Sequence, residues 1–190
     1  MYESFSALRI YRELILSSTK AKEYNRVLES AVREHLEKEK EVLMCVASGS
    51  MSPLLIKGDA VVVRRTLIDD LAVGDVVVFA FDSHIFTHRI VRIFKNSSGS
   101  VKVRAKGDRS RFFDRSFSAR SLIGVVSARD RRDRRIYFDT PYRKLCNRIN
   151  AEISYYHGIF FYFLRRLRRR IKRNTLFALH YYDRRKRTAG

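Results

Sequence analysis

The sequence predicts a mostly-β fold: a coiled, partly closed antiparallel sheet with a helical extension at each end. Three observations support this fold class. Residues 41–129 alternate short β-branched apolar runs with Gly-Asp and Ser-Gly turns, without helical segments between them. Residues 1–40 have helical spacing and contain no Gly or Pro, and residues 130–190 combine helical spacing with many basic residues. We therefore expect a helical extension over 1–40, a β domain over 41–129 and a basic helical extension over 130–190.

The first 40 residues contain two stretches with the periodicity of amphipathic helices. The first stretch is marked by Phe5, Leu8 and Ile15. The second has its buried face predicted at five positions: Tyr24, Val27, Leu28, Ala31 and His35. We expect these helices to form a collar against the sheet or a platform for a partner. The missing Gly turn between them does not support a DNA-binding helix-turn-helix.

Six short strands are predicted between residues 41 and 129. The first, over 41–47, is apolar and predicts a buried strand. It runs into Ser48-Gly49-Ser50, and the backbone must leave the sheet by Pro53, because proline cannot donate a ladder hydrogen bond. Turn signals bound the other five strands: 60–64, 76–81, 88–94, 101–106 and 122–128. Short strands without intervening helices predict an antiparallel sheet.

The C-terminal third is basic, with 19 Lys and Arg against 5 Asp and Glu over residues 129–190. Residues 149–174 predict an aromatic-rich helix with apolar positions three and four apart: Ile153, Tyr156, Phe160, Phe163, Leu164, Leu167 and Ile171. Two interpretations are open. The helix is interfacial and lies on an anionic membrane surface, or it covers the sheet and leaves a solvated basic face. The tail over 183–187 is predicted to be disordered.

The whole chain carries a formal net charge of +20, which attracts polyanions such as nucleic acid or an anionic membrane face. Cys45 and Cys146 have no metal or redox spacing, which suits a reducing compartment, and the five scattered His predict no metal site. No run of apolar residues reaches the length of a spanning helix, and the N-terminus does not resemble a signal peptide. We expect a peripheral membrane or cytoplasmic location.

A Ser, a His and two Asp follow predicted strands in chain order. Ser50 lies on the turn before Pro53, His88 follows the strand over 76–81, and Asp108 and Asp114 follow the strand over 101–106. A serine nucleophile needs an exposed hydroxyl on a fixed turn with free N–H groups beside it. Each residue also has a structural interpretation: a solvated Ser-Gly turn, a surface His, and Asp residues in turns.

Four short motifs resemble the signal peptidase I family, in its endoplasmic-reticulum and archaeal branch, over residues 42–128: Gly49-Ser50-Met51-x-Pro53, Gly74-Asp75-Val76-Val77, His88-Arg89-Ile90 and Lys106-Gly107-Asp108. That branch has His as the base where the bacterial branch has Lys. The resemblance implies a signal peptidase-like β fold and a serine endopeptidase, without a cofactor, that cuts leader or signal-type peptides after small residues. Members usually carry an N-terminal membrane anchor, which is not evident in this sequence.

The resemblance also implies roles for individual residues. Ser50 is the expected nucleophile and His88 the general base. In this branch the second Asp of a pair lies six residues beyond the Lys-Gly-Asp box. That position is Asp114, whereas Phe113 replaces the first Asp. We expect Asp114 to orient His88, with Asp108 as support. The expected oxyanion donors are the Ser50 N–H and the Ser48 hydroxyl, although Ser48 also suits a turn.

A second class of function competes with the peptidase. A non-catalytic or self-cleaving peptidase-like module would bind nucleic acid through its basic surface. Self-cleaving repressors of the SOS type share the Ser-Met motif but use Lys as the base. His88-Arg89 at the base position and the missing Gly turn in residues 1–40 count against the self-cleaving repressor type. Nucleic acid is therefore the less expected partner.

Overall fold

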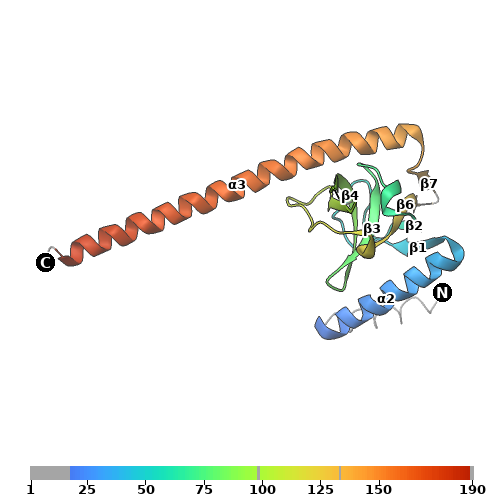
Figure 1. The fold of residues 1–190 in the computed structure, drawn as a ribbon, viewed down its shortest axis with the longest axis horizontal. Helices are drawn as coiled ribbons and strands as arrows, with labels where there is room; N and C mark the ends of the chain where they lie inside the picture. The colour runs from blue at the N-terminus through green and yellow to red at the C-terminus, as the bar shows by residue number, and fades with distance from the viewer. Residues whose placement is uncertain (1–17, 98, 133, 189–190) are drawn as a thin grey trace.

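A computed structural model describes residues 18–188 except 98 and 133. The predicted helix over Phe5, Leu8 and Ile15 lies outside these residues. Two helices and seven strands appear in the following order: α2 (Ser18–Glu39), β1 (Glu41–Cys45), β2 (Ala60–Arg64), β3 (Val76–Phe81), β4 (His84–Lys95), β5 (Val101–Lys106), β6 (Leu122–Arg131), β7 (Arg134–Tyr137) and α3 (Pro141–Thr188). In Figure 1, α2 lies below the sheet and α3 above it.

The strands form one antiparallel sheet in the order β1-β2-β6-β3-β4-β5, with β7 paired to the far end of β6. The sheet is not closed, and β1 and β5 are its ends. The predicted mostly-β class with helical extensions is confirmed. The strands predicted over 60–64, 76–81 and 101–106 have the observed bounds, because Gly-Asp turns adjoin each of them.

The central strand β3 is buried on both faces. Val76, Val78 and Ala80 belong to one apolar cluster, while Val77 and Phe79 belong to a second. This division follows from the alternation of side chains along a strand. The first cluster includes side chains from α2 and from the loop after β1, and the second includes β4, β5 and the segment before β6.

The buried face of α2 differs from the prediction by a small rotation of the helix. Val32 and Leu36 are buried and Leu28 is partly buried. The other four predicted positions are exposed: Tyr24, Val27, Ala31 and His35. Because residues 27 and 28 are both apolar, helical periodicity fits two different apolar faces of α2 and does not show which one is buried. Arg33 fixes the choice, because its guanidinium donates to the carbonyl oxygens of residues 122 and 120 beside β6.

Two parts of the sheet differ from the prediction. The expected buried strand over 41–47 is the end strand β1, whose residues alternate between exposed and half-buried and include an exposed Cys45. An end strand has a partner on one side only, which leaves it partly open to solvent. Strand β7, which pairs with the end of β6, was not predicted, because its Arg-rich sequence lacks the apolar alternation of the other strands.

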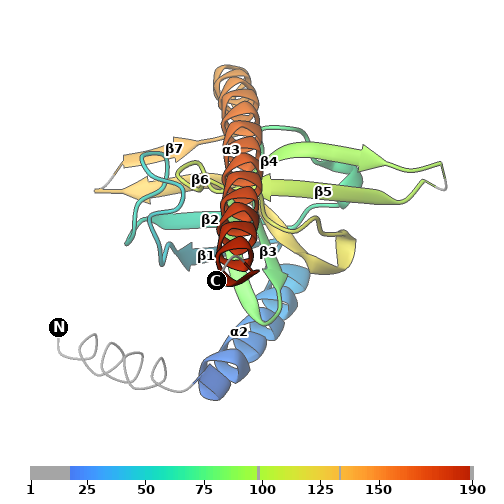
Figure 2. The same ribbon diagram turned by 90° about the vertical axis from the view of Figure 1, so that its left-hand side faces the viewer.

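The C-terminal helix α3 is 48 residues long and continues through the tail that was predicted to be disordered, so that prediction was wrong. Residues 183–187 include four Lys and Arg and no Gly or Pro, a composition that favours helix. Figure 1 shows that the first turns of α3 lie along the sheet and that its C-terminal half projects away. Figure 2, turned by 90°, shows α3 passing over the middle of the sheet.

The face of α3 that packs on the sheet is made of small and polar residues: Asn147, Ala151, Ser154 and Gly158. The apolar positions face outward. Ile153 is 63% exposed, Tyr156 64% and Phe163 60%. The interpretation in which these aromatics cover the sheet is therefore wrong. The Ile171 side chain lies outside the described part. No described helix is long and apolar enough to cross a membrane.

Candidate active site

The turn that carries Ser50 is anchored in the core on its C-terminal side. Val46 and Asp59 close the loop after β1, since the Val46 N–H donates to the Asp59 carbonyl over 2.9 Å. Within the loop, Met51 is 1% exposed and Leu55 is fully buried, and the Leu55 N–H donates to the Met51 carbonyl. Burial of two large apolar side chains fixes the backbone. Ser50, which directly precedes Met51, is half-exposed.

His88 reaches Ser50 from β4. Its Nε2 lies 3.0 Å from the Ser50 hydroxyl oxygen. Its side chain is only 9% exposed, and the centres of the Phe86 and Phe79 rings lie 5.8 and 6.3 Å from the centre of the imidazole. Antiparallel pairing of β4 with β3 places His88 opposite Val77. The ring is thus confined by the sheet and by aromatic neighbours.

Asp114 reaches His88 from the loop after β5. Its backbone N–H donates to the Ala105 carbonyl over 3.0 Å, which ties this loop to the end of β5. One carboxylate oxygen lies 2.6 Å from Nδ1 of His88. A carboxylate can only accept at this position, so the arrangement favours the tautomer with hydrogen on Nδ1. Nε2 is then free to accept the Ser50 proton.

Asp108 lies on the other side of the same loop and contacts Arg89, not His88. Its two oxygens accept from Arg89 Nε and Nη2 over 2.9 and 2.8 Å. Arg89 is fully buried, and its Nη1 also donates to the Gly74 carbonyl over 3.0 Å. Asp108 therefore neutralises a buried cation. The side chains of His88 and Arg89 point to opposite faces of β4, because side chains alternate along a strand. An Arg directly after the His is therefore the sequence feature that indicates the Arg89–Asp108 pair.

The expected oxyanion donors stand beside the Ser50 hydroxyl. The Ser48 hydroxyl oxygen is 3.2 Å from that of Ser50. The Ser50 N–H donates to no carbonyl among the described residues. The Ser50 carbonyl accepts the Arg109 N–H over 2.9 Å, which connects the turn to the loop that carries Asp108 and Asp114. The two segments are thus held together through the backbone as well as through His88.

Gly107 permits this close approach. A Cβ atom at this position would lie 3.0 Å from His88 Nε2, 3.0 Å from the Ser50 carbonyl oxygen and 2.6 Å from the Ser110 hydroxyl. Two of these three neighbours belong to the proposed catalytic pair. Glycine is therefore required here by space, in the middle of the Lys-Gly-Asp box.

Two arginines of β6, neither of which was predicted to have this role, clamp the loop that carries Ser50. Arg131 donates to the two Asp59 oxygens over 2.7 and 2.6 Å, and these bonds lower the pKa of Asp59. Arg129 and Arg131 also donate to the Leu54 carbonyl. In the sequence, the arginines at the end of β6 look like a solvated basic edge, so no local pattern identifies the clamp.

Helix α3 contacts the strand and loop that lead to Asp114. Lys106 is fully buried, and its ammonium donates to the Ser154 hydroxyl over 2.9 Å. Burial lowers the pKa of Lys106. Phe113, which replaces the Asp of the resembling branch, packs so close to Gly158 that a Cβ there would meet its ring at 2.5 Å. The departure from the family pattern thus coincides with the docking of α3.

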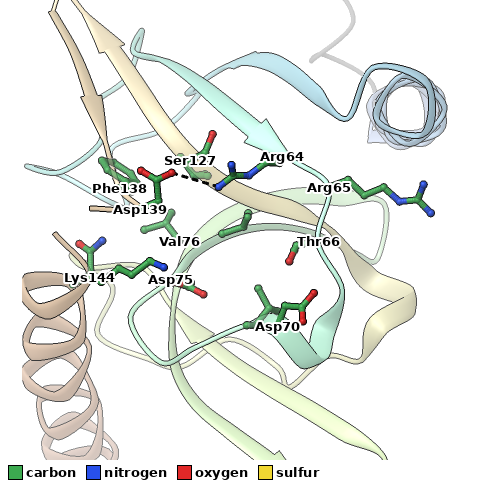
Figure 3. Close-up of a pocket in the computed structure, with 14 residues that line it drawn as sticks. Arg64, Arg65, Thr66, Asp70, Asp75, Val76, Ser127, Phe138, Asp139 and Lys144 are labelled. Carbon is green, nitrogen blue, oxygen red and sulfur yellow. Dashed lines mark ion pairs between the residues drawn. The ribbon is translucent and has the colours of Figure 1, made fainter. Parts of the chain in front are cut away.

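A separate cavity of about 170 Å³ lies between β2, β3, β6 and the start of α3, and none of Ser50, His88 and Asp114 lines it. Figure 3 shows the Arg64–Asp139 ion pair at one wall and Lys144 of α3 pointing toward Asp75. Burial raises the pKa of Asp75, whose carboxylate also accepts the Ala72 N–H over 2.8 Å. The described residues contain no cluster of three metal-ligating side chains.

Comparison with known proteins shows a partial similarity. No family model matches this chain. Over 75 residues the chain is 29% identical to the signal peptidase complex catalytic subunit SEC11C of Canis lupus familiaris, Pongo abelii and Homo sapiens. The match covers 38% of this chain and 39% of each relative, so the chain spans about two-fifths of the length of the curated relatives it matches. This similarity supports a signal-peptidase-like relationship.

Proposed function

We propose that this protein is a serine endopeptidase with Ser50 as nucleophile, His88 as general base and Asp114 as the group that orients the imidazole. One observation carries the proposal. A hydroxyl, an imidazole and a carboxylate from three separate segments are connected in series at 3.0 and 2.6 Å. This is the geometry in which nucleophile, base and orienting group work together, and such a geometry is recognised by roles and distances.

The proposed reaction has two stages, formation of an acyl-enzyme ester and its hydrolysis. The Ser50 oxygen attacks the peptide carbonyl while its proton moves to His88 Nε2. The tetrahedral oxyanion accepts hydrogen bonds from the Ser50 N–H and the Ser48 hydroxyl. When the C–N bond breaks, Nε2–H gives its proton to the leaving amine. Water then attacks the ester with His88 again as base, which releases the acid and restores the Ser50 hydroxyl.

The proposed substrates are leader or signal-type peptides. This class follows from the similarity to proteins named as signal peptidase catalytic subunits and from the motifs around Ser50 and His88. The test is incubation of the protein with leader-bearing peptides and with scrambled peptides of equal composition, followed by mapping of cuts by mass spectrometry. One preferred cut after a small residue in the leader peptides is expected. Equal cutting of scrambled peptides would contradict the substrate class.

We further propose that the enzyme works at an anionic membrane surface to which α3 attaches it. The outward apolar positions of α3 follow one another at steps of three and four: Ile153, Tyr156, Phe160, Phe163 and Leu167. Exposed arginines lie along the same segment: Arg165, Arg166, Arg168, Arg169 and Arg170. An aromatic stripe beside clustered arginines has the composition of an interfacial helix.

Vesicle flotation tests this attachment. Binding to anionic but not to neutral vesicles is expected, because each Lys or Arg near an anionic surface contributes roughly 1 kcal/mol. Replacement of Phe160 and Phe163 by Ser should weaken flotation without changing the net charge. A protein that ignores anionic vesicles but retains DNA with a steep salt dependence would favour the nucleic-acid-binding alternative.

A further inference from the structure

A second cavity lies between β5, the loop around Asp114 and α3. Its volume is about 720 Å³, within the size range of small-molecule sites. Lys102 and Arg104 of β5 form one wall, and Tyr155, Ile159 and Arg165 of α3 form the opposite wall. The cavity does not include Ser50 or His88. It is thus a site distinct from the proposed catalytic centre, although it borders the loop that carries Asp114.

The cations of this cavity lack carboxylate partners. Lys102, Arg104 and Arg165 form no ion pair with a described residue. The only carboxylate that lines the cavity among these residues belongs to Asp114, and one of its oxygens already lies 2.6 Å from His88 Nδ1. By contrast, the neighbouring Arg92 and the Arg131 clamp each have a carboxylate partner. Uncompensated positive charge around a hollow favours an anionic ligand.

Aromatic rings orient these cations. The Arg165 guanidinium lies 5.1 Å from the centre of the Phe112 ring. The Arg104 guanidinium lies 5.1 Å from the Phe94 ring and 5.8 Å from the Phe113 ring, and its Nε donates to Ser116. An arginine stacked on an aromatic face keeps N–H groups at its edge available, and that planar edge matches the oxygens of a phosphate.

An apolar rim adjoins the cations. Ile159 is 41% exposed and Tyr162 is 61% exposed, and both line the cavity. They continue the outward apolar face of α3 along the same helix. A small inorganic anion would use the cations and leave this rim uncovered. A ligand that joins a phosphate to a hydrocarbon chain would use both.

We propose that this cavity binds the phosphate of an anionic phospholipid, with Lys102, Arg104 and Arg165 around the phosphate and the acyl chains along Ile159 and Tyr162. The site gives the protein one specific lipid contact in addition to general attraction between its basic helix and a charged surface. It does not depend on Ser50 chemistry, so its failure would leave the proposed peptidase untouched.

A soluble lipid separates this site from general surface attraction. The probe is dihexanoyl phosphatidic acid, kept as monomers, titrated into the full-length protein by isothermal calorimetry. The pocket variant is Arg104→Gln with Arg165→Gln, and the matched control is Arg166→Gln with Arg168→Gln, which loses the same charge outside the cavity. We expect the pocket variant to bind at least about tenfold more weakly, since two charge-assisted contacts are lost. The control should keep the Kd of the wild type.

Two further arms identify the ligand and guard against misfolding. Glycerol 3-phosphate should bind more weakly than the lipid, and Ile159→Ser should weaken the lipid but not glycerol 3-phosphate. Because Ile159 is an exposed helical position, this variant serves as the test if the double arginine variant does not fold. Absence of lipid binding by the wild type, or equal losses in the pocket and control variants, would overturn the proposal. Equal affinity for lipid and glycerol 3-phosphate would also overturn it, in favour of a soluble phosphate.

Discussion

At the scale of single residues, the two carboxylates after β5 have different surroundings within one short loop. Asp114 contacts His88 at 2.6 Å, and Asp108 forms a bidentate pair with Arg89. The sequence identified both Asp residues and their order but could not assign them from residue patterns alone. Which Asp contacts His88 depends on the direction in which the Arg89 side chain points from β4. That direction is set by the tertiary fold.

Exchange of each carboxylate for an amide should separate the two environments. Asp114→Asn should slow cleavage by roughly 10²–10⁴-fold with a small change in Tm, because the amide no longer favours the tautomer that leaves Nε2 free. Asp108→Asn should instead lower the free energy of unfolding by roughly 2–3 kcal/mol, because buried Arg89 loses its counter-charge. Turnover assays and thermal denaturation measure both effects. The reverse pattern would assign the orienting role to Asp108.

The pH dependence of cleavage tests His88 as base. Protonated imidazole cannot accept the Ser50 proton, so the rate should fall when cleavage is measured from a pH of about 8 down to about 5. His88→Ala should remove the activity at every pH. A flat rate over this range, or an active His88→Ala protein, would exclude the role.

Gly107 provides a steric test of the same site. Gly107→Ala should reduce cleavage strongly, because the added methyl group meets His88 Nε2 and the Ser50 carbonyl at 3.0 Å. The fold should persist, since the change lies in a loop. Activity and far-UV circular dichroism are measured together. A fully active Gly107→Ala protein would show that the spacing between Ser50 and His88 tolerates displacement.

At the scale of elements, the loop that carries Ser50 is held at both ends. The buried side chains of Met51 and Leu55 hold the segment after Ser50 in the core. The ion pair between Asp59 and Arg131 fixes the chain where it enters β2. The Ser-Gly-Ser turn and Pro53 predicted that the chain leaves the sheet here. The clamp could not be predicted, because Arg131 is 72 residues away from Asp59 and lies in a run of similar arginines.

Asp59→Asn should weaken this clamp in a pH-dependent way. The pair lowers the pKa of Asp59 below its ordinary 3.8, so its stabilising contribution is complete above that pH and is lost as the pH falls through the lowered value. At neutral pH the substitution should cost roughly 2 kcal/mol of unfolding free energy, since charge-assisted bonds are lost. Urea denaturation at neutral pH and at pH values below 3.8 measures the difference. An equal cost at both would contradict the account.

At the scale of the whole molecule, α3 connects the site to its surroundings. Its small buried face allows Ser154 and Gly158 to approach Lys106 and Phe113, while its apolar residues remain outside. Helical periodicity predicted a helix in this region but not which side faces the sheet. The usual rule that apolar residues face the core fails here because buried polar partners on β4 and β5 select the opposite side.

The central claim is that Ser50 performs the chemistry, and the most direct measurement is turnover of a leader-bearing peptide by wild-type, Ser50→Ala and Ser52→Ala proteins. Ser52 is a matched control because it carries a hydroxyl on the same loop. The account predicts that Ser50→Ala lowers the rate of cleavage by a factor of at least roughly 10⁴ and leaves Tm unchanged, as expected when a nucleophile is removed. Ser52→Ala should keep most of the activity. Wild-type turnover by Ser50→Ala would contradict the account.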